Sequence, residues 1–147
     1  MIRTQIVGKG AKYVVLVNLP DLASSPSAKS QSASSQQLIA LSMVNGFNIA
    51  LRVGIDGLDT NVLYVDLFTQ TQMQVANGAA YGYTNTSAAA CGSNPLGGTS
   101  LVCNGLNTLT GVDVSKYMFA DSVHPTPYAN TLIAQYVADQ MKARGWL

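Results

Sequence analysis

The fold is decided by a strand–helix–strand pattern that begins with KYVVLVNLP (residues 12–20), a nearly continuous apolar run that ends at Pro20. Its β-branched and aromatic residues are typical of a strand that is buried on both faces in a parallel sheet. Apolar residues then recur at helical spacing over residues 36–52. A second run, VLYVDLF (62–68), predicts another buried strand. This order predicts a right-handed βαβ crossover, and therefore an α/β fold with parallel strands.

The clearest single element lies near the C-terminus. Thr126 is a favourable N-cap residue, and Pro127 suits the first position of a helix. An apolar stripe follows, and Gly145 is a typical helix terminator. These features together predict a helix over about 127–144.

Three segments between these elements carry weaker patterns. The Ser/Ala-rich stretch 24–35 is typical of a loop, whereas residues 69–77 indicate a short helix. Residues 78–112 are rich in Gly, Asn, Ser and Thr and lack clear periodicity. A stretch of this length without periodicity is usually functional or cross-linked.

The two predicted strands are too few for a stable open sheet. The edge beside Tyr13 to Leu19 would then expose unpaired backbone groups. Strands from other chains or self-association would cover that edge. We therefore predict a homo-oligomer that buries this edge, or the helix face beside it.

The composition limits the class of protein. The 147 residues are sufficient for one domain, 1–147, with a sizeable core. Only 10% of the residues are charged and the formal net charge is +1 without a basic cluster, so no nucleic-acid partner is expected. No apolar stretch reaches the roughly 18 residues of a membrane span. Residues 1–5 lack the apolar region of a signal peptide.

The two cysteines, Cys91 and Cys103, flank a Gly/Asn-rich loop. Their spacing fits either a disulfide or two buried thiols. A disulfide persists only in an oxidising compartment. Together with the low charge, it predicts an extracytoplasmic parent protein, and a natural N-terminus further upstream would explain the missing signal. No metal site or cofactor is expected, because a single histidine excludes the usual zinc spacing.

The single histidine, His124, follows Asp121 by three residues, just before the predicted C-terminal helix. A carboxylate at this spacing in a turn can reach Nδ1 and leave Nε2 free as a base. The structural alternative is a histidine that only caps the turn, with Asp121 as a solvated partner. The spacing alone favours this alternative.

Five segments in register resemble GDSL/SGNH-type serine ester hydrolases, and they cover nearly the whole chain. The stretch YMFADSVHPT resembles the last block of that family, Asp-x-x-His-Pro-Thr. The branch that includes autotransporter esterases is the most similar, through YGYTN and the following cysteine. The segments are residues 13–22, 47–51, 65–68, 81–85 and 117–126.

The resemblance implies part of a flavodoxin-like αβα sandwich of strand order 2-1-3-4-5, in which the two strands would be the fourth and fifth. The chain would be the C-terminal part of the domain, without the N-terminal strands. The resemblance also makes His124 the general base and Asp121 its orienting acid. The family's Gly-Asp-Ser nucleophile block, its oxyanion glycine block and its Gly-x-Asn-Asp block are absent from this sequence. Ser24, Ser25 and Ser122 are weak nucleophile candidates.

Two functions are therefore predicted. The first is a carboxylic-ester hydrolase that acts on short acyl esters, including lactones as cyclic esters, through the Asp121–His124 pair. The second is a non-catalytic, self-associating fragment of such a hydrolase that lacks the serine nucleophile block.

Overall fold

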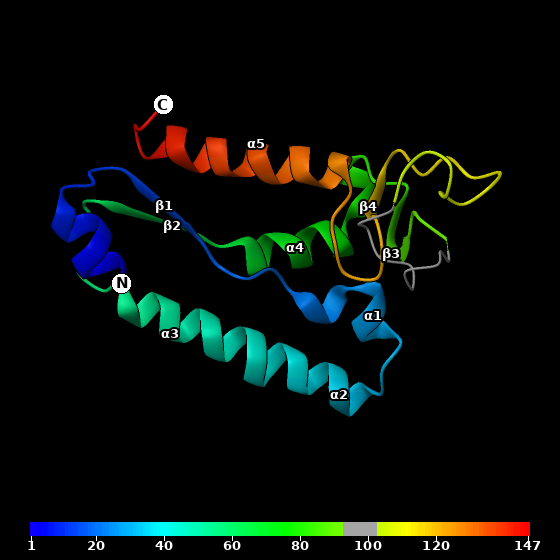
Figure 1. Cartoon of the computed structure of the whole chain (residues 1–147), viewed down its shortest axis with the longest axis horizontal. Helices are drawn as coiled ribbons and strands as arrows, with labels where there is room; N and C mark the ends of the chain where they lie inside the picture. The colour runs from blue at the N-terminus through cyan, green and yellow to red at the C-terminus, as the bar shows by residue number, and fades with distance from the viewer. Residues whose placement is uncertain (93–102) are drawn as a thin grey trace.

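The computed structural model describes residues 1–92 and 103–147. Strands β1 (Val14–Val17) and β2 (Val62–Val65) pair in parallel, with Val14 opposite Val62 and Val17 opposite Val65. A helical segment connects them and lies on one side of the pair, while helix α5 (Pro127–Ala143) lies on the other side (Figure 1). The predicted α/β class with parallel strands and a C-terminal helix is confirmed. The arrangement is compatible with part of an αβα sandwich of the SGNH type.

The other elements are short. A π-helical turn (Ile2–Ile6) and a 3₁₀ turn (Val7–Lys9) precede β1. After β1 come the 3₁₀ turn Leu22–Ser24 and helices α1 (Pro26–Lys29), α2 (Ala33–Leu38) and α3 (Gly46–Gly54), with a π-helical stretch (Ile39–Asn45) between the last two. After β2 come α4 (Leu67–Ala76), the 3₁₀ turn Gly78–Tyr81, β3 (Asn85–Ala89) and β4 (Tyr117–Phe119).

The stretch 24–35, predicted to be a loop, is partly helical. Ser25 and Ser32 are N-caps, because their side chains accept hydrogen bonds from the backbone N–H groups of Ala28 and Ser35. Pro26 occupies the first turn of α1, where its missing N–H group costs nothing. The Ser- and Pro-rich composition therefore marks helix starts here, and the loop prediction is wrong over this stretch.

Strand β1 is not buried on both faces, contrary to the prediction. All its residues are partly accessible, and the exposed fraction of Val17 is 37%. Within the described residues β2 is its sole partner, so the opposite edge carries unpaired backbone groups. In β2, by contrast, Val62 and Val65 are buried.

A second parallel pair, β3 with β4, was not predicted. The sequence of β3, NTSAA, is polar and small, and β4 has only three residues, so neither carries a recognisable strand pattern. The three residues of β4 are nevertheless all buried, because Met118 and Phe119 pack with Tyr83 and Ala129 in a core cluster beneath α5.

The carboxyl ends of β1 and β2 are joined by the side chain of Asn18, which is buried. Its amide nitrogen donates to the Tyr64 hydroxyl and to Oδ1 of Asp66, both at 2.9 Å. Its amide oxygen accepts from the backbone N–H of Phe68 at 3.0 Å. One amide thus connects the end of β1 to the end of β2 and to the first turn of α4.

Asp66 is the N-cap of α4 and accepts from the backbone N–H and the hydroxyl of Thr69. Burial acts to raise the pKa of this carboxyl, but the hydrogen bonds from Thr69, Asn18 and the backbone outweigh it and hold the pKa below its ordinary value. The ionised carboxylate therefore stabilises the folded state.

In the part of the chain that the structure describes, no helix has the length and apolar character needed to cross a membrane.

We predict that Asp66→Ala lowers the free energy of unfolding by about 1 kcal/mol at pH 7, because it removes the cap of α4. Asp66→Asn keeps an N-cap and should cost less. The folded-state pKa is depressed, so the contribution of the charge is present above the unfolded value of about 3.9 and is lost as pH falls through the folded value. Urea unfolding measures the free energy of unfolding of wild type and Asp66→Asn. The difference between the two values should become smaller below about pH 4. A difference that is constant with pH would contradict the assignment.

Candidate active site

His124 lies in a turn between β4 and α5 that backbone hydrogen bonds close at both ends. The N–H of Ala120 donates to the carbonyl of His124 at 2.8 Å, and the N–H of Thr126 donates to the carbonyl of Met118 at 3.0 Å. These two backbone hydrogen bonds therefore fix the conformation of the turn, residues 120–126.

Thr126 connects this turn to α5. Its hydroxyl accepts from the backbone N–H of Ala129, as predicted for the N-cap, and donates to the carbonyl of Tyr117 in β4. Because Thr126 is buried, both bonds are shielded from water. The start of α5 is thereby held against β4, two residues from His124.

The carboxylate of Asp121 contacts the ring of His124, with Oδ2 2.9 Å and Oδ1 3.1 Å from Nδ1. Oδ1 also accepts from the backbone N–H groups of Val123 and His124, at 2.8 and 2.7 Å. The side chain of Asp121 is 4% exposed and that of His124 is 66% exposed. A buried, multiply hydrogen-bonded carboxylate thus supports an accessible imidazole.

This geometry defines the chemistry available to His124. An ionised carboxylate only accepts hydrogen bonds, so Nδ1 carries the proton in the neutral ring. Nε2 then holds a free lone pair and can act as a base, while Asp121 stabilises the imidazolium that forms. The structure brings together the two residues singled out from the sequence; their catalytic role stays a prediction.

The hydroxyls of the three candidate nucleophiles are not bonded to His124 in the described part of the chain. The Ser24 hydroxyl donates to Oδ2 of Asp21 at 2.8 Å, and the buried Ser25 hydroxyl accepts from Ala28 as the cap of α1. Ser122 is exposed and directly follows Asp121. Within residues 1–92 and 103–147, none of the three hydroxyls is hydrogen-bonded to His124.

Cys91 and Cys103 form a disulfide beside the site, with their Cα atoms 5.8 Å apart. The backbone N–H of Cys91 donates to the carbonyl of Ala120, the residue before Asp121. This hydrogen bond connects the segment that follows β3 to the start of the active-site turn, and the disulfide attaches Cys103 at the same place. Most of the loop that it closes, residues 93–102, lies outside the described residues.

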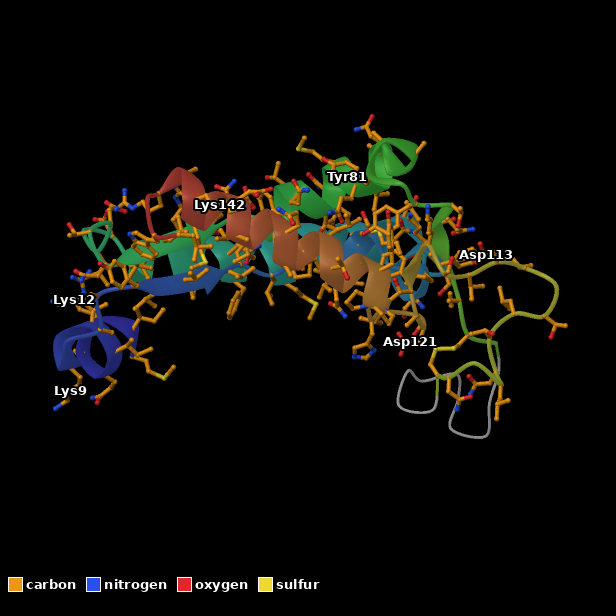
Figure 2. The ribbon with its side chains drawn as sticks, turned by 90° about the horizontal axis from the view of Figure 1, so that it is seen from above. Lys9, Lys12, Tyr81, Asp113, Asp121 and Lys142 are labelled. Atoms are coloured by element: carbon orange, nitrogen blue, oxygen red, sulfur yellow. A yellow bond between two sulfur atoms is a disulfide. The ribbon has the colours of Figure 1, made fainter. Side chains whose placement is uncertain are left out.

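The site lies at one end of the molecule. Figure 2 shows Asp121 and Asp113 at the end opposite Lys9 and Lys12. In the described ranges, His, Cys, Asp and Glu nowhere gather in a group of three that would hold a metal ion.

A cavity lies beside the turn. Its wall is formed by the segment after β1, by α4, β4 and α5, and by Val123 and Pro125, the two neighbours of His124. Its volume is about 60 Å³. This cavity could not be predicted from the sequence, because its wall comes from five separate parts of the chain.

No protein-family model matches the chain. Individual relatives do. The chain is 26% identical to the GDSL esterase/lipase APG of Arabidopsis thaliana over 92% of its own length and 41% of that protein. It is 31% identical to a second Arabidopsis GDSL esterase/lipase, over 86% of the chain and 36% of the relative. It is 34% identical to Lipase 1 of Photorhabdus luminescens, over 56% of the chain and 12% of that lipase.

The chain thus spans less than half the length of these relatives. The predicted resemblance is confirmed: this chain is similar to GDSL-type ester hydrolases over most of its own length, and it corresponds to only a part of each of them.

Proposed function

We propose that the chain is the histidine-bearing part of a carboxylic-ester hydrolase, in which His124 is the general base and Asp121 orients it. The contact of 2.9 Å between Nδ1 of His124 and the buried Asp121 carboxylate carries this proposal. The names of the relatives, esterases and lipases, support the same reaction class.

In the proposed reaction a serine hydroxyl attacks the ester carbonyl and gives its proton to Nε2 of His124. The imidazolium returns the proton to the leaving alcohol, and the acyl group stays on the serine. A water molecule then repeats the sequence and releases the carboxylic acid. A lactone would react in the same way, with both products joined in one hydroxy acid. Asp121 stabilises the imidazolium in both halves of the reaction.

The nucleophile in this proposal is a serine hydroxyl from within the chain or from a second chain. Ser24, Ser25 and Ser122 are candidates within the chain. However, the Ser24 hydroxyl donates to the Asp21 carboxylate, and the Ser25 hydroxyl accepts from the N–H of Ala28. A serine from a second chain would also satisfy the mechanism. Because Nε2 of His124 belongs to an exposed side chain, a hydroxyl from outside the chain has access to it.

The second candidate function is a non-catalytic module that associates with itself through β1. Tyr13, just before β1, is 72% exposed, and Val17 is also accessible. The N–H groups of Val14 and Asn18 donate toward β2, so the N–H groups of Val15 and Val17 face the open edge. Met43, Phe47 and Val53 form further exposed apolar surface on the connecting helix. We infer that a second copy of the chain covers this edge.

We also infer that residues 1–147 form one domain of an extracytoplasmic parent protein. The hydroxyl of Tyr136 in α5 donates to the carbonyl of Asp66, and Arg144 donates to the carbonyl of Asp59, so α5 is attached to both ends of the β2 region. The disulfide between Cys91 and Cys103 favours an oxidising compartment.

For the catalytic proposal, we expect the purified chain to hydrolyse p-nitrophenyl acetate, and His124→Ala and Asp121→Asn to lower the rate by about two or more orders of magnitude. Asp139→Asn, a change of an exposed carboxylate on α5, is the control and should leave the rate unchanged. If all variants match the buffer rate, and a fluorophosphonate labels none of them, the catalytic proposal is wrong and the non-catalytic module is favoured.

For the association proposal, light scattering of the eluting protein should give a mass of at least two chains. Val17→Lys places a charge on the open edge and should shift the species toward the monomer. Met73→Lys, at an exposed apolar residue of α4, is the control and should keep the mass of the wild type. A monodisperse monomer for the wild-type chain would rule out this proposal.

A further inference from the structure

A pocket with a volume of about 230 Å³ lies along the open edge of β2. Helix α5 begins three residues after His124 and spans 17 residues, so a length of about 25 Å separates its far end, at this pocket, from the active-site turn (Figure 1). The wall comes from α3, from the segment before β2, from β2 and from the residue after α5. Its residues are Arg52, Asp59, Val62, Leu63, Tyr64 and Arg144.

Two guanidinium groups line this pocket, and they come from opposite faces of the sheet. Arg52 belongs to α3 and Arg144 directly follows α5, and these helices lie on opposite sides of the β1–β2 pair (Figure 1). Each guanidinium lies near an aromatic ring, Arg52 at 5.0 Å from the centroid of Tyr64 and Arg144 at 5.9 Å from that of Trp146. A ring contact uses the face of the guanidinium and leaves the N–H donors at its edge available.

These donors are largely unused. In the part of the chain that the structure describes, neither arginine forms an ion pair. Arg144 donates to the backbone carbonyl of Asp59, a neutral acceptor. Both side chains are exposed, so a ligand from solution can reach them.

The backbone of β2 adds a third donor. The N–H groups of Val14 and Asn18 donate to the carbonyls of Asn61 and Val65, so alternation along β2 turns the N–H of Tyr64 toward the open edge. Among the described residues β2 pairs with β1 alone, so no strand takes up this N–H group. Tyr64 is also part of the pocket wall. Three donors on separate elements therefore serve the same edge.

The charges of the wall favour an anion. The two guanidinium groups carry +2 and the Asp59 carboxylate −1, which leaves a formal charge of +1. Arg52 also borders a neighbouring pocket, which has Asp66 in place of Arg144. Burial acts to raise the pKa of Asp66, but hydrogen bonds hold it below its ordinary value, so the ionised carboxylate cancels the charge of Arg52 there. An anion is therefore bound better between Arg52 and Arg144.

The size of the pocket and the shape of a guanidinium limit the anion further. An apolar cavity of about 150 Å³ holds one benzene molecule, so about 230 Å³ has room for roughly nine non-hydrogen atoms. A guanidinium matches a carboxylate through two parallel N–H···O bonds. Two guanidinium groups in one pocket therefore match two carboxylates on a short chain. Succinate is slightly smaller than this limit, and Val62 and Leu63 offer apolar surface to its methylene groups.

We propose that this pocket binds a small aliphatic dicarboxylate, with one carboxylate on Arg52, the other on Arg144, and the N–H of Tyr64 as an additional donor. The proposal does not depend on the function proposed above, because the pocket lies at the far end of α5 from His124. The chain then carries a binding site for an organic dianion that is separate from the ester site.

The test is a titration of the full ¹⁵N-labelled chain with succinate, followed through the side-chain Nε–H resonances of its arginines. The chain has Arg3, Arg52 and Arg144, and each resonance is assigned by its disappearance when that residue is changed to Gln. Succinate should shift the resonances of Arg52 and Arg144 and leave that of Arg3 in place. Succinamide, the neutral diamide of the same shape, should shift none of them.

The variants separate the pocket from the general charge of the chain. Arg52→Gln and Arg144→Gln should each weaken succinate binding by about two- to fivefold, as expected for one exposed ion pair. Arg3→Gln is the matched control, since Arg3 lies outside the pocket wall and donates to the carbonyl of Asp56, and it should bind like the wild type. Asp59→Asn should tighten binding, because it removes the negative charge of the wall and keeps the carbonyl that Arg144 uses.

The proposal is overturned if succinate leaves the Arg52 and Arg144 resonances in place, or if Arg3→Gln weakens binding as much as the other two changes. It is also overturned if succinamide binds as well as succinate, if Asp59→Asn leaves the affinity unchanged, or if inorganic phosphate binds more tightly than succinate. Hydrolysis of p-nitrophenyl acetate is a separate measurement. Its absence with succinate binding intact would count against the proposed function alone.

Discussion

The rest of the site depends on the hydrogen bonds that the buried carboxylate of Asp121 accepts. A carboxylate removed from water is stable only when its oxygens are hydrogen-bonded, and here two backbone N–H groups and the imidazole of His124 supply those bonds. The same bonds fold residues 120–126 into the turn that links β4 to α5. The hydrogen bonds to the Asp121 carboxylate thus fix both the orientation of the imidazole and the path of the backbone.

The surroundings of the turn are held from several directions. Thr126 fixes the start of α5 to β4, and the disulfide-bonded Cys91 donates to the residue before Asp121. The end of the sheet is held separately, through the amide of Asn18. In contrast, the open edge of β1 and the exposed ring of His124 both present unused bonding capacity. A second chain at the edge of β1 and a serine nucleophile at His124 are the partners that we propose.

Much of the fold could be predicted from the sequence, because β1, β2 and α5 carry strong local patterns. Apolar β-branched runs indicated the two strands, and Thr126 with Pro127 indicated the start of α5. The pair β3–β4 could not be predicted, since NTSAA has no strand pattern and forms a strand through its pairing with β4. The burial of β1 was overestimated, because an apolar run does not reveal how many neighbours a strand has.

The sequence by itself indicated the Asp121–His124 pair, because a carboxylate three residues before a histidine in a turn can reach Nδ1 and because this segment resembles the last block of GDSL/SGNH-type hydrolases. It also determined the parallel β1–β2 unit and the cap of α5, which depend on local pattern and connection length. Only the tertiary structure decided the cavity beside His124 and the unpartnered nitrogen of Gln74. Both arise where segments distant in the chain pack together, and whether a buried polar atom finds a partner depends on that packing and not on its neighbours in sequence.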